Sequence, residues 1–293
     1  MAQPAVFNRK LVSREEAVLP ADARALALGE ACFETLRVYP GGKVLGFRQH
    51  LDRLMRGLTQ LGFDPQYHAQ AFHPDTAAAE LLQLIDQCGL SETGARVRIQ
   101  AGRADCSGIR ADAPPVFFCM MMAAAFEPQS RAVALHAGDF RRIPPDAWDA
   151  SVKWSFYQPA VQALRTAHNA GFDDTLFWDA AGNLACGALS NIFLISGSAV
   201  STPSLESGAL HGITRGLICE ALADAGIPVQ ERHHSPADVQ SAEALFLTSS
   251  LREIAPVARL GKRKKAVNHP MLQRVCTVFE TYRNQNLNPL HKL

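Results

Sequence analysis

Ser151-Val152-Lys153-Trp154-Ser155-Phe156-Tyr157 places one lysine among apolar and aromatic residues. Lys153 is the only lysine between Lys43 and Lys262, and the other basic side chains of that interval are all arginine or histidine. The segment is not a charge-rich surface run, so the presence of an amine here needs an explanation.

Two interpretations of Lys153 follow from this segment alone. An amine held among apolar groups has its charged form disfavoured, so it can act as a nucleophile near neutral pH. A lysine that bonds covalently to a carbonyl compound needs that reactivity. In the alternative, the stem of the lysine packs on apolar surface while its ammonium group reaches water, and the residue has no chemical role.

Several motifs follow Lys153 in order along the chain. They are Gly171-Phe172-Asp173-Asp174-Thr175-Leu176-Phe177-Trp178-Asp179, Gly182-Asn183-Leu184, Ser190-Asn191-Ile192-Phe193-Leu194-Ile195, Thr202-Pro203, Leu210-His211-Gly212-Ile213-Thr214-Arg215 and Leu245-Phe246-Leu247-Thr248-Ser249-Ser250. Their order and spacing resemble the class IV (fold type IV) pyridoxal-phosphate enzymes, which comprise branched-chain and D-amino-acid aminotransferases and aminodeoxychorismate lyase. The resemblance runs from about Gly29 to about Val257.

This resemblance implies a two-domain α/β (α+β) fold. A small N-terminal α/β domain would cover residues 1–122, a linker 123–131, and a larger domain with a barrel-like sheet 132–293, which binds pyridoxal 5'-phosphate. The resemblance also implies a homodimer whose active site lies at the domain junction and receives a contribution from the partner subunit. Lys153 would be the catalytic lysine, which bonds to the cofactor and moves a proton between the substrate Cα and C4′ of the cofactor.

Composition excludes several other classes of protein. The chain has 293 residues, of which 47% are hydrophobic and 19% charged, with a formal net charge of +1. This balance gives no support for nucleic acid or an anionic membrane as partner. Its seven cysteines are scattered singly, which fits a reducing cytoplasm better than a disulfide framework. We see no secretory signal, and the longest apolar run, 116–126, is too short to span a membrane.

The N-terminal part is predicted to contain a strand over 32–39, a return strand over 43–47, and a helix that begins at Phe47 and stops at Gly62. Arg53 lies away from the apolar face of that helix, and periodicity alone therefore indicates a solvated arginine. By resemblance, His50-Leu51-Asp52-Arg53-Leu54 matches the motif whose arginine binds the cofactor phosphate, and forked hydrogen bonding suits arginine to that role. Phe33 matches a phenylalanine of the substrate pocket.

Two further arginines are candidates for substrate binding. Alternation over 96–100 places Arg98 and Arg96 on one face of a strand, and Arg110 falls in a polar loop over 102–113. By resemblance, Arg98 matches an arginine at the substrate pocket of the branched-chain enzymes. Across a two-residue gap, Arg110 matches the arginine that grips the substrate carboxylate in the D-amino-acid enzymes. A strand-edge or surface arginine is the alternative for both.

The C-terminal part supplies a candidate phosphate site. An apolar periodic segment follows Gly212, which places the amides of Ile213 and Thr214 at a helix N-terminus, where unpaired N–H groups and the helix dipole favour phosphate. By resemblance, Ser250 takes the phosphate-contact position. The loop over 249–252, with Ser249 and Leu251, forms part of the substrate pocket.

Two more residues are assigned by resemblance. Tyr157 matches the tyrosine beside the cofactor ring oxygen, with core packing as the alternative. Cys186 stands where the family usually has a glutamate that pairs with the pyridine nitrogen and keeps it protonated. A thiol is a weak donor at best, so the ring works unprotonated, or another group supplies the partner, or catalysis is reduced. No metal is expected, because the adjacent pair His233-His234 cannot present two ligands from one helix face.

Three functions remain open from the sequence. The first is a class IV aminotransferase that acts on a small amino acid and keto acid pair. The second is a lyase like aminodeoxychorismate lyase, which releases pyruvate. The third is a catalytically impaired family member that binds the cofactor without efficient turnover. Retention of Lys153 favours an active enzyme, whereas Cys186 favours altered chemistry.

Overall fold

The computed structural model describes residues 3–66, 69, 72–106, 108–110, 114–128 and 131–293. The chain divides into two compact units. Unit 1 comprises residues 1–127, 152–156 and 286–293, and unit 2 comprises residues 128–151 and 157–285. The segment that carries Lys153 therefore belongs with the N-terminal part of the chain.

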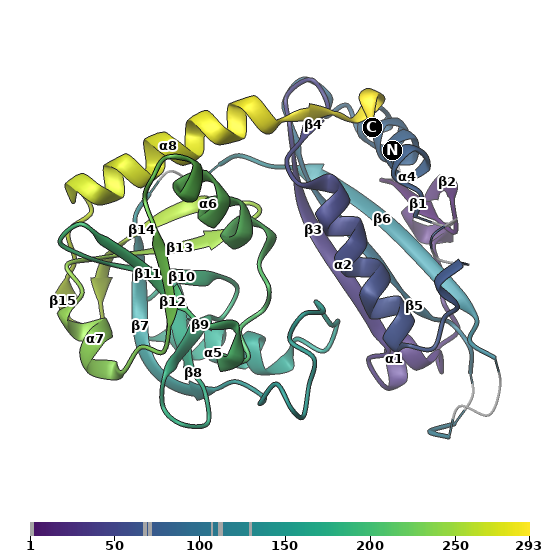
Figure 1. Cartoon of the computed structure of the whole chain (residues 1–293). Coiled ribbons are helices and arrows are strands. Elements are labelled where there is room, and N and C mark those ends of the chain that lie inside the picture. Colours follow the sequence, from purple (N-terminus) through teal and green to yellow (C-terminus); the bar gives the residue numbers. More distant parts are fainter. Residues whose placement is uncertain (1–2, 67–68, 70–71, 107, 111–113, 129–130) are drawn as a thin grey trace. The chain divides into compact units, whose positions relative to one another are not determined.

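Unit 1 is built on a seven-stranded sheet in the order β16-β4-β3-β5-β6-β1-β2 (Figure 1). Its strands are β1 (Pro4–Phe7), β2 (Lys10–Ser13), β3 (Ala31–Tyr39), β4 (Lys43–Val44), β5 (Ala95–Arg103), β6 (Phe117–Ala125) and β16 (Asn288–Pro289). Its helical segments are η1 (Arg14–Glu16), α1 (Arg24–Ala27), α2 (Phe47–Gln60), α4 (Pro74–Gln87) and η3 (Leu290–Lys292).

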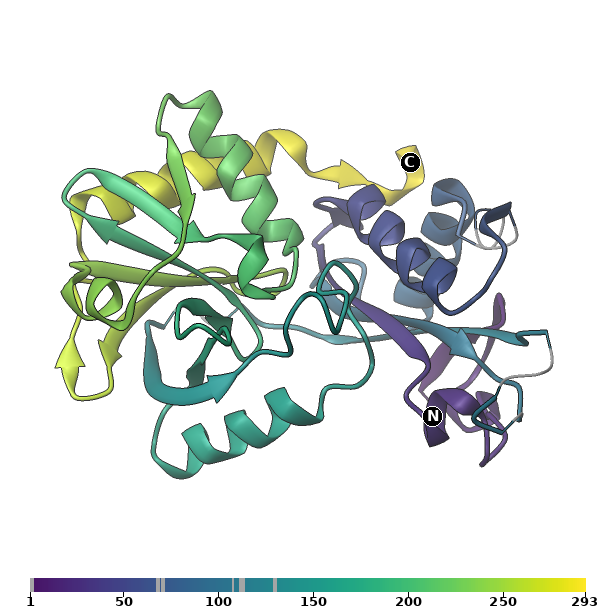
Figure 2. The ribbon, with the colours of Figure 1, turned by 60° about the horizontal axis from the view of Figure 1, so that its bottom comes forward.

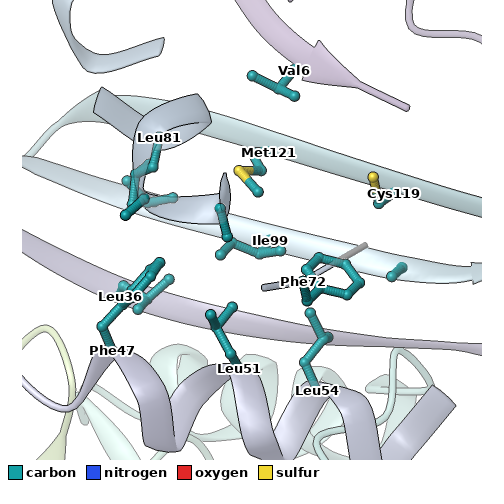
Figure 3. Packing of buried hydrophobic residues seen from close by; sticks show 14 of the residues in the cluster. Val6, Leu36, Phe47, Leu51, Leu54, Phe72, Leu81, Ile99, Cys119 and Met121 are labelled. Atoms are coloured by element: carbon teal, nitrogen blue, oxygen red, sulfur yellow. The ribbon is translucent and has the colours of Figure 1, made fainter. Parts of the chain in front are cut away.

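The core of unit 1 lies between one face of this sheet and helices α2 and α4. Because side chains alternate across a strand, Leu36 of β3 and Ile99 of β5 point to the face that these helices cover. Figure 3 shows Phe47, Leu51 and Leu54 pointing from α2 toward the sheet. The opposite face of the central strands carries polar and aromatic residues instead, and the candidate site residues of this unit lie there or beneath α2.

Unit 2 contains a nine-stranded mixed sheet in the order β12-β11-β10-β13-β14-β7-β8-β9, with β15 paired to β14. β9 is last in this order, yet it contacts β10 and β11, so the sheet curls toward a barrel (Figure 2). The strands are β7 (Val133–Arg141), β8 (Asp174–Trp178), β9 (Leu184–Gly187), β10 (Asn191–Ser196), β11 (Ala199–Pro203), β12 (Val229–Arg232), β13 (Ala244–Ser249), β14 (Glu253–Leu260) and β15 (Arg263–Lys264).

The helical segments among the described residues of unit 2 are α5 (Gln158–Asn169), η2 (Leu205–Ser207), α6 (Ile213–Asp224), α7 (Pro236–Ser241) and α8 (Pro270–Asn286). α5 contacts β7 and β8, whereas α6 contacts β12 and β13. The helix predicted after Gly212 is confirmed, because α6 begins at Ile213. The predicted end of α2 is also confirmed, since Gly62 follows the helix in the left-handed region at φ +86°.

One predicted boundary was wrong. β5 continues to Arg103, so the polar loop begins after residue 103 rather than at 102. β6 continues to Ala125, so the last three residues of this strand fall within the stretch 123–131 that was predicted as the linker. In both places pairing between β5 and β6 extends the strands beyond what local sequence indicates. Residues 107 and 111–113 of the polar loop lie outside the described residues.

Candidate active site

Lys153 is fixed by a short strand-like addition to the edge of β3. The Phe33 N–H donates to the Lys153 carbonyl at 2.9 Å, and the Ser155 N–H donates to the Ala31 carbonyl at 2.8 Å. Since side chains alternate along an extended segment, Val152 and Trp154 pack against the unit 1 core and Lys153 points the other way. The apolar neighbours of Lys153 therefore orient it, because their packing against the core turns the lysine to the opposite side.

The helix α2 approaches this segment closely because it has a glycine at the contact. A Cβ on Gly57 would lie 2.8 Å from Cys32 Sγ and 2.8 Å from Val152 Cγ1. Such distances are shorter than real Cβ contacts, so any other residue at position 57 would push the helix or the lysine segment away.

The half-buried amine of Lys153 lies over an aromatic ring. Its Nζ is 4.9 Å from the centroid of the Phe33 ring, and the guanidinium carbon of Arg98 is 3.7 Å from the same centroid. Arg98 Nε also donates to Gln100 Oε1 at 3.1 Å. Phe33, Arg98 and Lys153 thus meet on the face of the sheet that α2 and α4 leave uncovered, which brings together three of the predicted site residues.

Arg53 lies on the other face of the sheet, beneath α2, and is buried, with 3% of its surface exposed. Its Nε donates to Glu34 Oε1 at 2.6 Å and its Nη2 to Glu34 Oε2 at 2.7 Å. The interpretation of Arg53 as a solvated arginine, which periodicity alone favoured, is wrong. A fully buried carboxylate on β3 compensates its charge, and helical periodicity cannot reveal that partner.

His50 completes this buried group, because its Nδ1 lies 2.6 Å from Glu34 Oε2. Burial alone would raise the pKa of Glu34, but the positive charge and hydrogen bonds of Arg53, with the contribution of His50, lower that pKa to about 2. Burial lowers the pKa of His50, so we expect a neutral ring whose Nδ1–H donates to the carboxylate. The group therefore holds Arg53 in one orientation.

In unit 2, the N-terminus of α6 has no side-chain cap. Gly212 is the N-cap residue, and no side chain accepts from the first-turn amides. A Cβ on Gly212 would lie 1.9 Å from Asn191 Oδ1, so only glycine lets the asparagine fit against the start of the helix. Asn191 Nδ2 donates to the Leu210 carbonyl at 2.9 Å, which fixes the turn that leads into Ile213 and Thr214.

The end of β13 provides hydroxyl groups in the same unit. Thr248 pairs with Asn191 across β10 and β13, so both side chains face the same side of the sheet. Among the described residues, the Thr248 hydroxyl is one of a few buried side-chain groups without a hydrogen-bond partner. Ser249 Oγ accepts from the Arg252 N–H at 3.3 Å, so this serine shapes the turn that contains Ser250 and Leu251.

That turn has a strained residue at its end. Glu253 has φ +56°, in the left-handed region that residues other than glycine rarely adopt. Its carboxylate accepts from Arg283 Nη1 of α8 at 2.8 Å. An ion pair from a distant helix thus helps to hold a conformation that local sequence would not choose.

Cys186 is buried in an apolar cluster of unit 2. The cluster contains Ala160, Ala163, Phe177, Ala185, Cys186, Ala188 and Ala209, with Phe140, Tyr157 and Leu164 packed against it. Burial raises the pKa of the Cys186 thiol. The structure therefore brings Cys186 and Tyr157 into one cluster and keeps the thiol neutral.

The remaining predicted residue, Arg110, is exposed in a turn, next to an exposed Ile109. Arg103, the last residue of β5 before this loop, is buried, and its Nη2 lies 2.8 Å from Asp105 Oδ2. Arg103 therefore has a structural role as the partner of Asp105. Arg110 is not among the predicted site residues that meet around Lys153.

Three charged residues near the candidate site residues were not predicted from the sequence: Glu34, which pairs with Arg53, and Asp174 and Arg142, whose charges act on Cys186. Glu34 shares a face of its strand with Cys32 and Leu36, and a charged residue within such an apolar stripe signals a buried partner. Asp174 stands at the start of the apolar strand β8, where the same argument applies. Nothing local marks Arg142.

Comparisons with known proteins agree with this architecture. Residues 31–260 match the family model described as Amino-transferase class IV. The chain is 27% identical over 263 residues to aminodeoxychorismate lyase of Bacillus subtilis, covering 86% of this chain and 85% of that protein.

Two solved structures share the fold. The branched-chain aminotransferase of Thermoproteus uzoniensis, solved with norvaline, superposes with a TM-score of 0.86 at 22% identity, covering 99% of this chain and 100% of that one. The branched-chain amino acid aminotransferase of Thermobaculum terrenum, solved in its PLP form, gives a TM-score of 0.82 at 19% identity over 99% and 98% of the two chains.

The chain is therefore an enzyme of the class IV aminotransferase family. Among the helices of the described residues, none is long and apolar enough to cross a membrane. The same part of the chain contains no group of three or more His, Cys, Asp and Glu side chains that could hold a metal ion.

Proposed function

We propose that this chain is a pyridoxal-phosphate-dependent aminotransferase that transfers an amino group between a small, apolar amino acid and a keto acid. The observation that supports this most is the placement of Lys153, which two backbone hydrogen bonds to β3 hold beside Phe33 and Arg98, on the face of the sheet opposite α2 and α4. A positioned lysine is the group that bonds covalently to this cofactor.

The residues present fit the cofactor's phosphate. The uncapped N-terminus of α6 offers the amides of Ile213 and Thr214, and the buried Thr248 hydroxyl nearby lacks a partner. Ser250 would add a hydroxyl from the turn after β13. Arg53 would add charge, and its bidentate pair with Glu34 would fix the direction in which the guanidinium points.

The other side chains have roles toward the ring and the substrate. When bound, the cofactor supplies the electron sink for chemistry at the substrate Cα. Lys153 would move the proton between Cα and C4′, and Tyr157 and Cys186 would contact the ring. Phe33, Arg98, Arg110, Ser249 and Leu251 would bind substrate, and the proposed enzyme is a cytoplasmic homodimer.

A pyruvate-releasing lyase is the second candidate. The observation that favours it is the neutral, buried thiol of Cys186 in place of a carboxylate, because a weaker electron sink disfavours transamination. The similarity to the Bacillus subtilis lyase points the same way.

The purified protein loaded with pyridoxal phosphate distinguishes these functions. We would record its visible spectrum before and after adding amino acids, and measure pyruvate in the absence of any keto acid. Conversion of the cofactor from its aldehyde to its amine form supports the aminotransferase. Pyruvate without that conversion supports the lyase, and neither product supports an impaired enzyme. Lys153→Ala is the control in each assay.

A further inference from the structure

Among the described residues, Asp174 is the carboxylate whose charge acts on Cys186, and it already has other partners. Asp174 Oδ1 accepts from the backbone N–H of Thr175 at 2.8 Å and of Ala188 at 2.9 Å, and Oδ2 accepts from Ser190 Oγ at 3.0 Å. Gly187 leaves room for the last of these bonds, since its Cβ would lie 2.3 Å from Ser190 Oγ. Asp174 therefore holds the turn after β9 and is not placed to pair with a cofactor nitrogen.

The second charged group near Cys186 is positive. Arg142 Nε donates to the Gly208 carbonyl at 3.1 Å, and its guanidinium carbon lies 5.8 Å from the centroid of the Phe177 ring. Phe177 is the direct partner of Cys186 in the pairing of β8 with β9, so the two side chains share a face. Arg142 and Cys186 thus both neighbour the Phe177 side chain.

Electrostatics around the thiol agree with this geometry. Burial raises the pKa of Cys186, the charge of Arg142 lowers it, and that of Asp174 raises it. A positive charge disfavours protonation of any nearby base, and a neutral thiol cannot offset that effect. Burial strengthens the electrostatic effects of Arg142 and Asp174, because the side chains of the Cys186 cluster are mostly alanine and aromatic.

We propose that Arg142 and Cys186 together keep the pyridine nitrogen of the bound cofactor unprotonated. This inference rests on the proposed function, which places the ring beside Cys186. A glutamate at this position would be a proton partner for the nitrogen, whereas here a thiol and a guanidinium disfavour the proton. The electron sink is then weaker, so Arg142 and Cys186 determine which reactions the lysine can drive.

Nuclear magnetic resonance of pyridoxal phosphate labelled with nitrogen-15 in its ring reports protonation directly. In the wild-type protein we expect the chemical shift of an unprotonated nitrogen at neutral pH. Cys186→Glu should give the protonated signal, and Cys186→Ser, the matched neutral variant, should not. Arg142→Gln should raise the pKa of the ring nitrogen by at least about one unit, which is tenfold in the protonated fraction, and Arg142→Lys should not.

A protonated ring nitrogen in wild-type protein at neutral pH would overturn the inference, whatever the variants show. In that case the absorbance of the lysine-linked cofactor would still be present and the proposed function would stand. If the wild-type protein forms no lysine-linked cofactor, the proposed function fails and the inference fails with it.

Discussion

Glu34 is the residue on which the buried charge balance of unit 1 depends. It is fully buried and accepts two hydrogen bonds from Arg53 and one from His50. Two charges removed from water are costly unless they are paired with good geometry, and removal of one leaves the other uncompensated.

We therefore expect Glu34→Gln to lower the free energy of unfolding by about 3–5 kcal/mol, because it leaves the Arg53 guanidinium buried without its counter-charge. Chemical denaturation followed by circular dichroism measures this. Asp75→Asn is the control, because Asp75 pairs with His73 at an exposed site and should cost less than about 1 kcal/mol. Equal, small effects of both substitutions would contradict the buried-pair account.

We expect His234 to make the stability of unit 2 depend on pH. Its side chain is buried, its Nε2 lies 2.8 Å from Ser201 Oγ, and burial together with the charge of Arg232 lowers its pKa from 6.5 to about 4. A histidine with a lowered pKa in the folded state contributes stability that is present above its unfolded pKa and is lost as the pH falls toward the folded value.

The melting temperature should therefore fall between pH 6.5 and about pH 4 in the wild type, and fall less in His234→Gln. His233→Gln is the matched control, because His233 is adjacent and exposed, and it should keep the wild-type slope. The same slope in His234→Gln as in the wild type would show that another group carries the pH dependence.

At the scale of elements, α6 depends on a glycine for the shape of its N-terminus. Gly212 has φ −67°, so its role is not conformational freedom but space for Asn191. Gly216, one turn later in the same helix, has no other group within 4 Å of the position that a Cβ would take, and so provides a control that isolates this effect.

We expect Gly212→Ala to weaken binding of pyridoxal phosphate at least tenfold, or about 1.4 kcal/mol, because Asn191 and the first turn must move apart. Gly216→Ala should leave binding unchanged and stabilise the protein by about 0.5–1 kcal/mol, as expected for a helix interior. Fluorescence titration with the cofactor and thermal melts measure both. Unchanged binding in Gly212→Ala would contradict the assignment of this helix as the phosphate site.

Elements were predicted well where the signal is local. The end of α2 follows from Gly62, which adopts positive φ, and α6 follows from the apolar periodicity after Gly212. The partners of charged residues were not predicted. Arg53 pairs with Glu34, which lies 19 positions earlier in the sequence, and the Lys153 segment joins the edge of β3. Neither contact could be predicted, because pairing between distant segments leaves no mark in local sequence.

At the scale of the whole molecule, unit 1 is completed by residues distant in the sequence. β16 pairs with β4, and Leu290, which follows it, is 2% exposed within the unit 1 core. The contacts of the lysine segment and of this C-terminal segment place both in a unit otherwise formed by residues 1–127. Unit 1 therefore draws on three parts of the chain.

Leu290→Ala should destabilise unit 1 by about 2–5 kcal/mol through lost burial and a cavity. Leu26→Ala, at a position that is 61% exposed, should change stability by less than about 0.5 kcal/mol. Hydrogen exchange followed by mass spectrometry assigns the effect, and we expect faster exchange in β3 to β5 and no change in β10 and β13. Faster exchange confined to β10 and β13 would contradict this division.

The most direct test of the account is the identity of the lysine that bonds to the cofactor. Borohydride reduction of the protein loaded with pyridoxal phosphate makes that link permanent, and peptide mass spectrometry then locates it. We predict that the phosphopyridoxyl group is found on Lys153 and is absent from the Lys153→Ala protein. A group found mainly on another lysine, such as Lys43 or Lys265, or no specific modification at all, would contradict the central claim.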